Sequence, residues 1–500
     1  MSSFIGIDLG TTFSVVAHLD GTGRPTILRN DEGSNLTPSC VSMDPDTGVI
    51  EVGEIARRTW GAAPEQAAAR FKRDMGTSKV HEINHKKFTP TQLSAFVLKK
   101  LGKVASSSLG PVTEAVVTIP ANFSNEARNA TMVAAKDAGL NIQYIVNEPT
   151  AAAIYYAFKD GSEMDGVYAV YDLGGGTFDI SVIQVSGQDV KVIASNGVAR
   201  LGGDDFDQTL TDLVAERYQR ESGEAFEPDL YTIMDAEEDK KSLSRRRRVQ
   251  AKVGRTLIEV TRHEFEEAIS ALVAQAEMLC ESTIEEAGFQ RSDIRQVLLA
   301  GGSTRVPLVR RSVERVFGRE PTSTVNVDEV VALGATLYAA YMSDPANLTP
   351  VQKHAIDQLR LEERTNKCFG TLSLDSGQQA GGRKLKNAIL IPKGTKIPCA
   401  VAESFYTVHD DQQAVDCVLT ESTAPETDPR FVTKVKEAEL PLPPGRPKGQ
   451  EIKVTFAYDA NQIMRCSFED VATGRKTEME VSVVSSSSEG SAGIEPFLVE

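Results

Sequence analysis

Hydrophobic and polar positions follow two different patterns along this chain. Up to about residue 342, short apolar runs alternate with segments in which apolar residues recur at helical spacing. The clearest runs are 114–119 and 296–300, and the clearest helical segments are 126–138 and 262–287. Strands that alternate with helices are typical of an α/β domain.

The pattern changes after residue 342. Residues 343–366 are polar, with a short helix predicted from Thr349, and predict a connector. From 367 to 484 the helical spacing gives way to short alternating runs such as 451–458, separated by turn residues. This pattern predicts a β-sandwich of roughly a hundred residues. The serine-rich run 485–491 predicts a disordered segment.

Two segments of the α/β region repeat each other. Residues 5–17 and 168–182 each contain an apolar strand that ends in an aspartate (Asp8 and Asp172), a Gly/Thr reversal, and a second strand of β-branched residues. A repeat over this separation indicates a duplicated domain. We expect its two equivalent turns to face each other across a cleft.

The residues of these turns suit a nucleotide. Glycines let backbone N–H groups approach an anion closely, threonines add hydroxyl donors, and aspartates supply oxygens for Mg²⁺. The alternative is two ordinary β-hairpins, because glycine and aspartate are common turn residues. The match between two long copies disfavours that alternative.

Composition narrows the class of protein. A chain of 500 residues predicts about two or three domains. Its net charge of −16 argues against general binding to nucleic acid or anionic membranes. The six cysteines lack zinc-site spacing, no apolar run is long enough to span a membrane, and the first strand leaves no room for a signal peptide. We therefore expect a cytoplasmic protein with reduced thiols.

Further motifs resemble the heat-shock ATPase chaperone family of DnaK, in that family's order. They are the two turns and residues 146–153, 196–207, 299–307 and 325–335. The resemblance implies a duplicated actin-like (ribonuclease-H-like) two-lobed ATPase domain over 1–345, a polar interdomain linker over 346–366, a β-sandwich peptide-binding domain over 367–484 and a disordered Ser-rich tail over 485–500. It further implies an ATP-dependent chaperone that hydrolyses ATP to ADP and phosphate and binds extended apolar polypeptide segments.

The resemblance also implies roles for individual residues. Asp8 and Asp172 would anchor a hydrated Mg²⁺ and nearby K⁺. Lys72, Glu148, Thr177 and Asp179 would take part in hydrolysis: Lys72 by stabilising the transferring phosphoryl group, and Glu148 by orienting water. The remaining nucleotide-binding residues would be Gly10, Thr11, Thr12, Phe13, Gly174, Gly175, Gly176, Gly202, Gly203, Glu237, Lys240, Ser244, Gly301, Gly302, Ser303, Arg305 and Asp328.

Plain structural roles are the alternatives for single residues. Lys72 beside Asp74 would be a surface ion pair, and Glu148 would cap the helix that begins near Pro149. In the β-domain, Phe405 and Val415 would line a pocket for one apolar peptide side chain, and Leu374 and Val408 would form an arch over the peptide. Core packing is the alternative for Phe405 and Val415.

The chain departs from the family pattern in four places. It stops after the sandwich, without a helical lid, and its linker is longer and more polar, which puts coupling between the domains in doubt. Tyr144 stands where the family carries an arginine that grips J-domain cochaperones, so we expect a specialised J-domain partner. Loops 76–89 and 249–260 are short, as in lidless bacterial members of the HscC type, which leaves the need for an exchange factor open.

Three further interpretations concern surfaces and function. We interpret Arg245–Arg248 as a solvated rim, and the apolar residues 494–500 as a segment that inserts into the peptide groove of its own or another copy. The alternative to a general chaperone is a nucleotide-dependent regulator that holds one specific partner protein. A small-molecule kinase is a third possibility, against which the peptide-binding-like sandwich counts.

Overall fold

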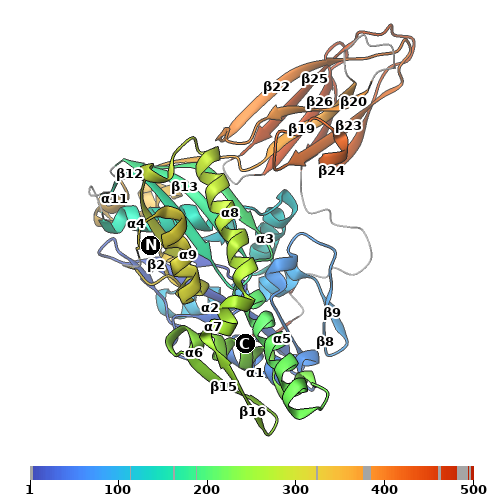
Figure 1. Cartoon of the computed structure of the whole chain (residues 1–500). Helices are drawn as coiled ribbons and strands as arrows, with labels where there is room; N and C mark the ends of the chain where they lie inside the picture. Colours follow the sequence, from blue (N-terminus) through green and yellow to red (C-terminus); the bar gives the residue numbers. More distant parts are fainter. Residues whose placement is uncertain are drawn as a thin grey trace. The chain divides into compact units, whose positions relative to one another are not determined.

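The computed structural model describes residues 4–112, 114–160, 164–186, 189–322, 325–357, 359–374, 384–459, 463–480, 494 and 497–500. The chain divides into two compact units (Figure 1). Unit 1 comprises Met1–Phe123, Ala130–Leu361 and Ser488–Glu500, and unit 2 comprises Ser124–Asn129 and Glu362–Ser487.

Lobe I, residues 4–147 of unit 1, is built on a sheet of order β11-β10-β1-β2-β3, in which β4 also pairs with β2. Strand β1 lies parallel to β10 and antiparallel to β2. The bounds are β1 Ile5–Asp8, β2 Phe13–Leu19, β3 Pro25–Ile27, β4 Thr37–Pro38, β10 Glu114–Ile119 and β11 Asn141–Asn147. A smaller sheet of order β6-β5-β7 contains β5 Cys40–Met43, β6 Ile50–Val52 and β7 Ala67–Ala69, and β8 His81–Ile83 pairs with β9 Lys86–Phe88.

Lobe II, residues 165–322, repeats this arrangement with strands in the order β17-β12-β13-β14. Strand β12 lies parallel to β17 and antiparallel to β13, as β1 does to β10 and β2. The bounds are β12 Asp165–Leu173, β13 Phe178–Ser186, β14 Asp189–Val198 and β17 Ile294–Ala300, and a separate hairpin is formed by β15 Arg248–Val253 and β16 Thr256–Thr261. The repeated topology confirms the duplicated two-lobed fold.

Eleven α-helices are described in the chain up to residue 361. They are α1 Glu54–Ala62, α2 Pro90–Leu109, α3 Asn125–Asp137, α4 Glu148–Asp160, α5 Gly203–Ser222, α6 Ile233–Arg245, α7 Arg262–Ala268, α8 Ser270–Glu286, α9 Pro307–Phe317, α10 Val330–Met342 and α11 Pro350–Ile356. Residues 262–287, predicted as one helix, form two, because the backbone at Ile269 (ψ 1°) leaves helical geometry. The side chain of Ile269 is fully buried there.

Two glycines allow helix α10 to pack closely against helix α4 and strand β1. A Cβ atom on Gly334 would lie 1.7 Å from the carbonyl oxygen of Ala151, and one on Gly6 would lie 2.2 Å from the backbone nitrogen of Thr336. Helix α10 is apolar around its circumference and is buried over 330–340, as expected for a helix enclosed by its neighbours. This packing fixes the start of α4, where Glu148 lies.

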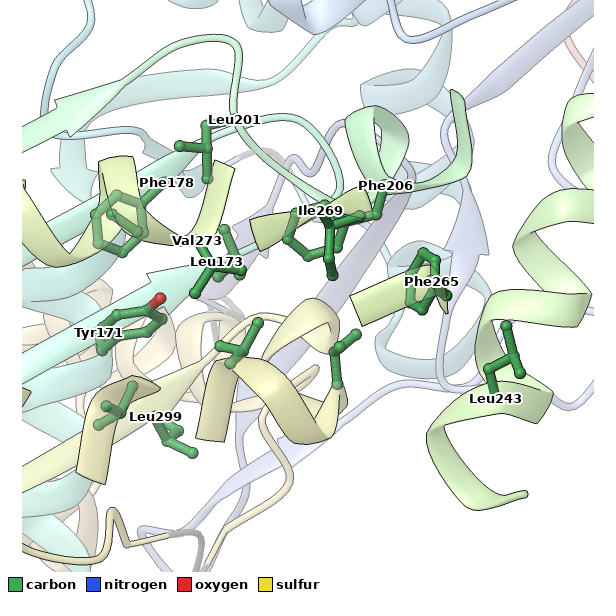
Figure 2. Packing of buried hydrophobic residues seen from close by; sticks show 14 of the residues in the cluster. Tyr171, Leu173, Phe178, Leu201, Phe206, Leu243, Phe265, Ile269, Val273 and Leu299 are labelled. Carbon is green, nitrogen blue, oxygen red and sulfur yellow. The ribbon is translucent and has the colours of Figure 1, made fainter. Parts of the chain in front are cut away.

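The core of lobe II lies between the β12–β13 hairpin and its covering helices. Figure 2 shows Tyr171, Leu173 and Phe178 of the hairpin with Ile269 and Val273 of the α7–α8 region in one apolar cluster. The rings of Tyr171 and Phe178 lie 4.8 Å apart between centroids. Because Asp172 alternates with these buried neighbours along β12, its side chain points away from this core.

The segment predicted as a polar linker packs onto unit 1 through its few apolar residues. Ile356 and Leu359 are buried in the cluster that also contains residues of α4 and α10, and Leu361 packs against it. The amide of Gln352, on α11, donates to the carbonyl oxygens of Leu19 and Asp20, at 3.2 Å each. The segment is polar on average, yet it is attached to unit 1 through these specific contacts.

Unit 2 contains two four-stranded antiparallel sheets, which confirms the predicted β-sandwich. Their orders are β20-β19-β23-β24 and β22-β25-β26-β27. The bounds are β19 Cys368–Leu374, β20 Leu385–Ile391, β22 Cys399–Tyr406, β23 Ala414–Ser422, β24 Thr433–Pro441, β25 Glu451–Tyr458, β26 Met464–Asp470 and β27 Arg475–Glu480. Two short strands, β18 Arg360–Arg364 and β21 Lys396–Ile397, pair antiparallel at Glu363 and Arg364. Apolar residues from both sheets form one core.

The end of the chain differs from both predictions made for it. Ile494 and Val499 are buried in the core cluster of lobe I, which Phe497 also contacts, so these residues are neither disordered nor placed in the peptide site predicted in unit 2. Apolar side chains that follow a polar run bury themselves wherever a matching surface is available. The serine-rich run 485–491 and residues 481–484 lie outside the described residues.

Neither disulfides nor membrane-spanning helices are found in the described part of the chain. All six cysteines are free thiols, and five of them are buried. None of the described helices combines the length and the apolar character needed to cross a bilayer. The thiols are packing residues, in agreement with their apolar surroundings in the sequence.

Candidate functional site

A cavity of about 830 Å³ opens between the two repeated turns of unit 1. Most of the residues expected to bind a nucleotide or metal line it: Asp8, Gly10, Thr11, Thr12, Phe13, Lys72, Glu148, Asp172, Gly174, Gly175, Thr177, Gly203, Glu237, Lys240, Ser244, Gly301, Gly302, Ser303, Arg305 and Asp328. Three expected residues, Asp179, Gly176 and Gly202, lie behind this lining. The structure therefore brings together residues from segments that are up to about 320 positions apart in the sequence.

The two turns approach each other so closely that side chains larger than hydrogen do not fit. A Cβ atom on Gly175 would lie 1.9 Å from Oγ1 of Thr12, and one on Gly176 would lie 2.5 Å from Oγ1 of Thr11. Behind them, a Cβ on Gly202 would lie 2.5 Å from the carbonyl oxygen of Gly175. The hydroxyl oxygen of Thr12 is buried and has no hydrogen-bond partner in the described structure, which suits a phosphate ligand.

Polar side chains brace the lobe II turn. Oγ of Ser303 donates to the carbonyl oxygen of Gly174 at 2.7 Å. Nζ of Lys240 donates to the carbonyl oxygen of Gly203 at 2.9 Å and pairs with Asp207 at 2.7 Å. These bonds occupy two carbonyl oxygens of the turn region, so these oxygens are engaged by donors instead of facing an anion.

Lys72 and Glu148 form a buried ion pair at the cavity. Nζ of Lys72 lies 2.6 Å from Oε1 of Glu148, and the two residues are only 4% and 8% exposed. Lys72 comes from a 3₁₀ turn, Phe71–Asp74, which follows Arg70 in a left-handed conformation (φ 62°). Non-glycine residues with positive φ are strained and concentrate at functional sites. The surface ion pair with Asp74 that the sequence left open for Lys72 is not formed.

Three aspartates surround this pair in a poorly solvated site. Burial raises the pKa of Asp8 to about 7 and that of Asp179 to about 8, the Glu148 carboxylate adds to both increases, and Lys72 opposes them. The pKa of Asp172 is raised well above its ordinary value, first by burial and then by Glu148, Asp179 and Asp8. The three aspartates and Glu148 share the single ammonium group of Lys72, so a further cation would stabilise their ionised forms.

The donor set fits a hydrated Mg²⁺ better than a directly coordinated metal. Within the described residues, no three acidic, histidine or cysteine side chains converge closely enough to ligate a metal ion themselves. Mg²⁺ keeps several of its waters and uses one or two carboxylates together with substrate phosphates. Asp8 and Asp172 line the cavity beside the phosphate-type turns and are placed for this role.

The opposite wall of the cavity is formed by one face of α6 and a second 3₁₀ turn. Glu237, Lys240 and Ser244 recur at helical spacing and line the cavity together. Gly302, Ser303 and Arg305 lie in the turn Gly302–Arg305 that follows β17. Nη1 of Arg305 pairs with Asp328 at 2.7 Å.

Arg57 was missed by the sequence reasoning. Its Nη2 donates to Oε2 of Glu237 at 2.9 Å, and its guanidinium lies 5.2 Å from the centroid of the Phe13 ring. Helix α1 of lobe I is thereby joined to α6 of lobe II beside the cavity. Nothing in the local sequence around Arg57 marks such a contact, because its partner is 180 positions away.

A group of charged residues behind the turns was also missed. Arg73 forms an ion pair with Asp205 at 2.5 Å, and Arg70 pairs with Asp204 at 3.2 Å. The available signal was the dense run of charges at 70–74, which is unusual for a segment bounded by apolar residues. Arg245 lines the cavity as well, so the first residue of the arginine run is not solely a solvated rim.

Three of the four residues expected to bind peptide lie on strands of unit 2, and Val408 lies in the connection between β22 and β23. Phe405, on β22, and Val415, on β23, are half-buried and pack against the sandwich core. Leu374 ends β19 with 40% of its surface exposed. The backbone N–H of Val408 donates to Oε1 of Gln412 at 3.0 Å. Their roles in peptide binding stay predictions, as does the core-packing alternative.

Comparisons with known proteins agree with this architecture. A family model described as Hsp70 protein matches residues 4–87 and 78–495. The chain is also similar to the chaperone protein DnaK of Thermotoga neapolitana: 36% of 496 aligned residues are identical, covering 96% of this chain and 80% of that relative. Hsp70 proteins are ATPases that use ATP and ADP with Mg²⁺ and bind unfolded polypeptides. The chain belongs to the Hsp70 family and is an ATP-dependent molecular chaperone.

Proposed function

We propose that the cavity of unit 1 is the site where this chaperone binds and hydrolyses ATP. The observation that carries the proposal is the convergence of two glycine-lined turns, one from each lobe, on the buried pair of Lys72 and Glu148. The turns hold the phosphates through backbone N–H groups and the hydroxyls of Thr11, Thr12 and Thr177. The face of α6 and the Gly302–Arg305 turn hold the adenosine.

Lys72 and Glu148 act on the terminal phosphoryl group and the attacking water. The Lys72 ammonium is placed to stabilise negative charge on the transferring group, and in this poorly solvated site its effect exceeds that of an exposed lysine. Glu148 orients the water and holds Lys72 in place. Asp179 lies directly opposite Asp172 in the β12–β13 pairing and orders the polar groups around both.

Asp8 and Asp172 hold the Mg²⁺ that accompanies the nucleotide. The ion supplies charge neutralisation between phosphate oxygens. Thr118 donates to Oδ1 of Asp8 at 2.9 Å, which keeps that carboxylate oriented towards the cavity. We assign K⁺ to the same acidic region, because its carboxylates carry more negative charge than the ammonium group of Lys72 neutralises.

Unit 2 binds the polypeptide. An extended segment gains main-chain hydrogen bonds from the sandwich and inserts one apolar side chain between Phe405 and Val415, beneath Leu374 and Val408. The exposed Leu374 and its strand partner Leu385, 50% exposed, leave apolar surface unburied at this end of the sheet. The regulator with one dedicated partner is the less favoured alternative.

Two further assignments concern the setting in which the chaperone works. We place it in the cytoplasm, where its six free thiols stay reduced. Its cochaperone is a specialised J-domain protein, because Tyr144 leaves lobe I without the family's arginine. Tyr144 lines a separate cavity of about 210 Å³ together with Phe4 and Met342. The abbreviated β15–β16 hairpin leaves the need for an exchange factor open.

Equilibrium binding of ATP tests the placement of the site. Gly202→Ala introduces a methyl group 2.5 Å from the Gly175 carbonyl oxygen, and we expect at least a tenfold loss of ATP affinity. Gly21→Ala is the control, because nothing lies within 4 Å of its Cβ position. Equal affinities in the two variants, with both folded by circular dichroism, would place ATP elsewhere.

A further inference from the structure

The last residues of the chain add a strand to the small sheet of lobe I. The backbone N–H of Ile50 donates to the carbonyl oxygen of Leu498 at 2.8 Å, and that of Glu500 donates back to Ile50 at 2.8 Å. The N–H of Val52 donates to the carbonyl oxygen of Glu500 at 3.2 Å. Ile50 and Val499 form a parallel bridge. Because β6 is the edge strand in the order β6-β5-β7, the segment satisfies backbone groups of an otherwise open edge.

Side chains of the segment alternate between a buried and an exposed face. Val499 is 1% exposed, whereas its neighbour Leu498 is 61% exposed. The ring of Phe497 lies 5.6 Å from those of Phe88 and Phe96 between centroids, and Nζ of Lys86 lies 5.7 Å from its centroid. Nζ of Lys103, on α2, donates to the carbonyl oxygen of Val499. The contact therefore combines an aromatic anchor with strand addition, as peptide-binding grooves do.

We propose that lobe I carries a second peptide-docking groove, formed by β6, Phe88, Phe96, Lys86 and Lys103, whose occupant is the C-terminal segment 494–500 of the same chain. The groove is separate from the nucleotide cavity, none of whose lining residues belongs to it. It is also separate from the predicted peptide site, which lies in unit 2. This proposal does not depend on the residue roles given under the proposed function.

The docked segment is a detachable ligand. A three-residue strand pairing and three apolar side chains contribute a free energy of the same order as the entropy cost of ordering seven residues. The tether raises the local concentration of the segment, so docking in the same chain prevails over a free peptide.

Amide hydrogen exchange tests occupancy in the full chain. The N–H groups of Ile50 and Val52 donate to the segment, so we expect them to be protected. Phe497→Ala should raise their exchange at least tenfold, and the control Leu498→Ala should leave it unchanged, since Leu498 is exposed. Equal exchange in both variants overturns the proposal. Protection that depends on protein concentration overturns docking within one chain and assigns the segment to a second copy.

Binding of a free peptide tests the groove itself. A labelled peptide with the sequence of residues 494–500 should bind the variant that lacks 488–500 at least tenfold more tightly than it binds the full chain. Lys103→Glu in the truncated chain should weaken this binding, whereas Phe405→Ala should not. The reverse result, loss with Phe405→Ala alone, would place the peptide in unit 2 and contradict the groove. Equal binding to truncated and full chains would also contradict it.

Discussion

Nζ of Lys72 lies 2.6 Å from Oε1 of Glu148, and both residues line the cavity between the two turns. The two residues come from different elements of lobe I, a 3₁₀ turn and the start of α4. The contact holds one cation and one carboxylate beside the phosphate turns. Preorganised charges of this kind need no rearrangement when the reaction begins.

Replacing Lys72 should separate nucleotide binding from hydrolysis. We expect Lys72→Ala to lower single-turnover ATP hydrolysis by roughly 10²- to 10³-fold, the usual effect of removing one transition-state donor. The phosphate turns remain, so the Kd for ATP should change by less than about tenfold. Lys79→Ala is the control, since its side chain is 56% exposed and pairs with Asp74. Hydrolysis at the wild-type rate in Lys72→Ala would exclude the proposed role.

The bridge between Arg57 and Glu237 should slow the release of nucleotide. It joins lobe I to lobe II beside the cavity, and its loss removes about 1 kcal/mol from the closed arrangement. We therefore expect Arg57→Ala to speed the dissociation of a fluorescent ADP analogue by roughly fivefold. Arg58→Ala, on the same helix but 76% exposed, should have no effect.

A double-mutant cycle decides whether the bridge itself is responsible. In Arg57→Ala combined with Glu237→Gln, the two effects on ADP dissociation should be less than additive, because each variant breaks the same contact. Additive effects would mean that Arg57 acts through the Phe13 ring instead, from whose centroid it lies 5.2 Å.

The attachment of the linker should carry the signal between the units. Leu359 is fully buried in the cluster formed with α4 and α10, and Leu359→Ser replaces an apolar contact with a polar one. We expect it to abolish stimulation of the ATPase by peptide and to leave basal turnover within about twofold. Val351→Ser on α11, where the side chain is 52% exposed, is the matched control. Stimulation retained in Leu359→Ser would exclude this route.

The β-domain should lose stability in acid through Asp470. Hydrogen bonds from Arg446 hold the pKa of this buried carboxyl below its ordinary value of 3.8, and Thr473 donates to it at 2.6 Å. A depressed pKa stabilises the fold above the pKa of the unfolded chain, and that stability is lost as the pH falls through the folded value. We expect Asp470→Asn to cost about 2 kcal/mol at pH 7, roughly 10 °C in Tm.

The measurement is the Tm of the β-domain transition between pH 7 and pH 3. The difference between wild type and Asp470→Asn should begin to shrink below the unfolded pKa of about 3.9, because the unfolded chain then binds a proton that the folded carboxylate still excludes. A constant difference over this range would mean that packing, rather than charge, sets the effect.

The parts of the fold that could be predicted are those whose signal is local in the sequence. The turns after Asp8 and Asp172 contain glycines and threonines in the sequence itself, so their duplication and their phosphate-binding chemistry could be predicted from it. The two lobes followed from the repeat of these turns, and the sandwich followed from the change in apolar spacing. Lys72 and Glu148, by contrast, could be assigned only through a family motif, because no local signal links two residues 76 positions apart.

The contacts that escaped prediction depend on partners that are distant in sequence. Arg57 and Glu237 meet only after both lobes have folded. Residues 494–500 were predicted to insert into the peptide groove, whereas Ile494 and Val499 are buried on lobe I, because hydrophobic burial is non-directional. The linker was judged by its average polarity, whereas its attachment rests on Ile356 and Leu359.

We expect ATP hydrolysis in unit 1 to respond to peptide binding in unit 2, because the linker is attached to unit 1 through Ile356 and Leu359. Steady-state ATP turnover by the purified protein, measured with and without a short extended apolar peptide and alongside Lys72→Ala, tests it most directly. We predict turnover that rises severalfold with peptide and disappears in the variant. Turnover that ignores the peptide, or that persists in Lys72→Ala, would contradict the account.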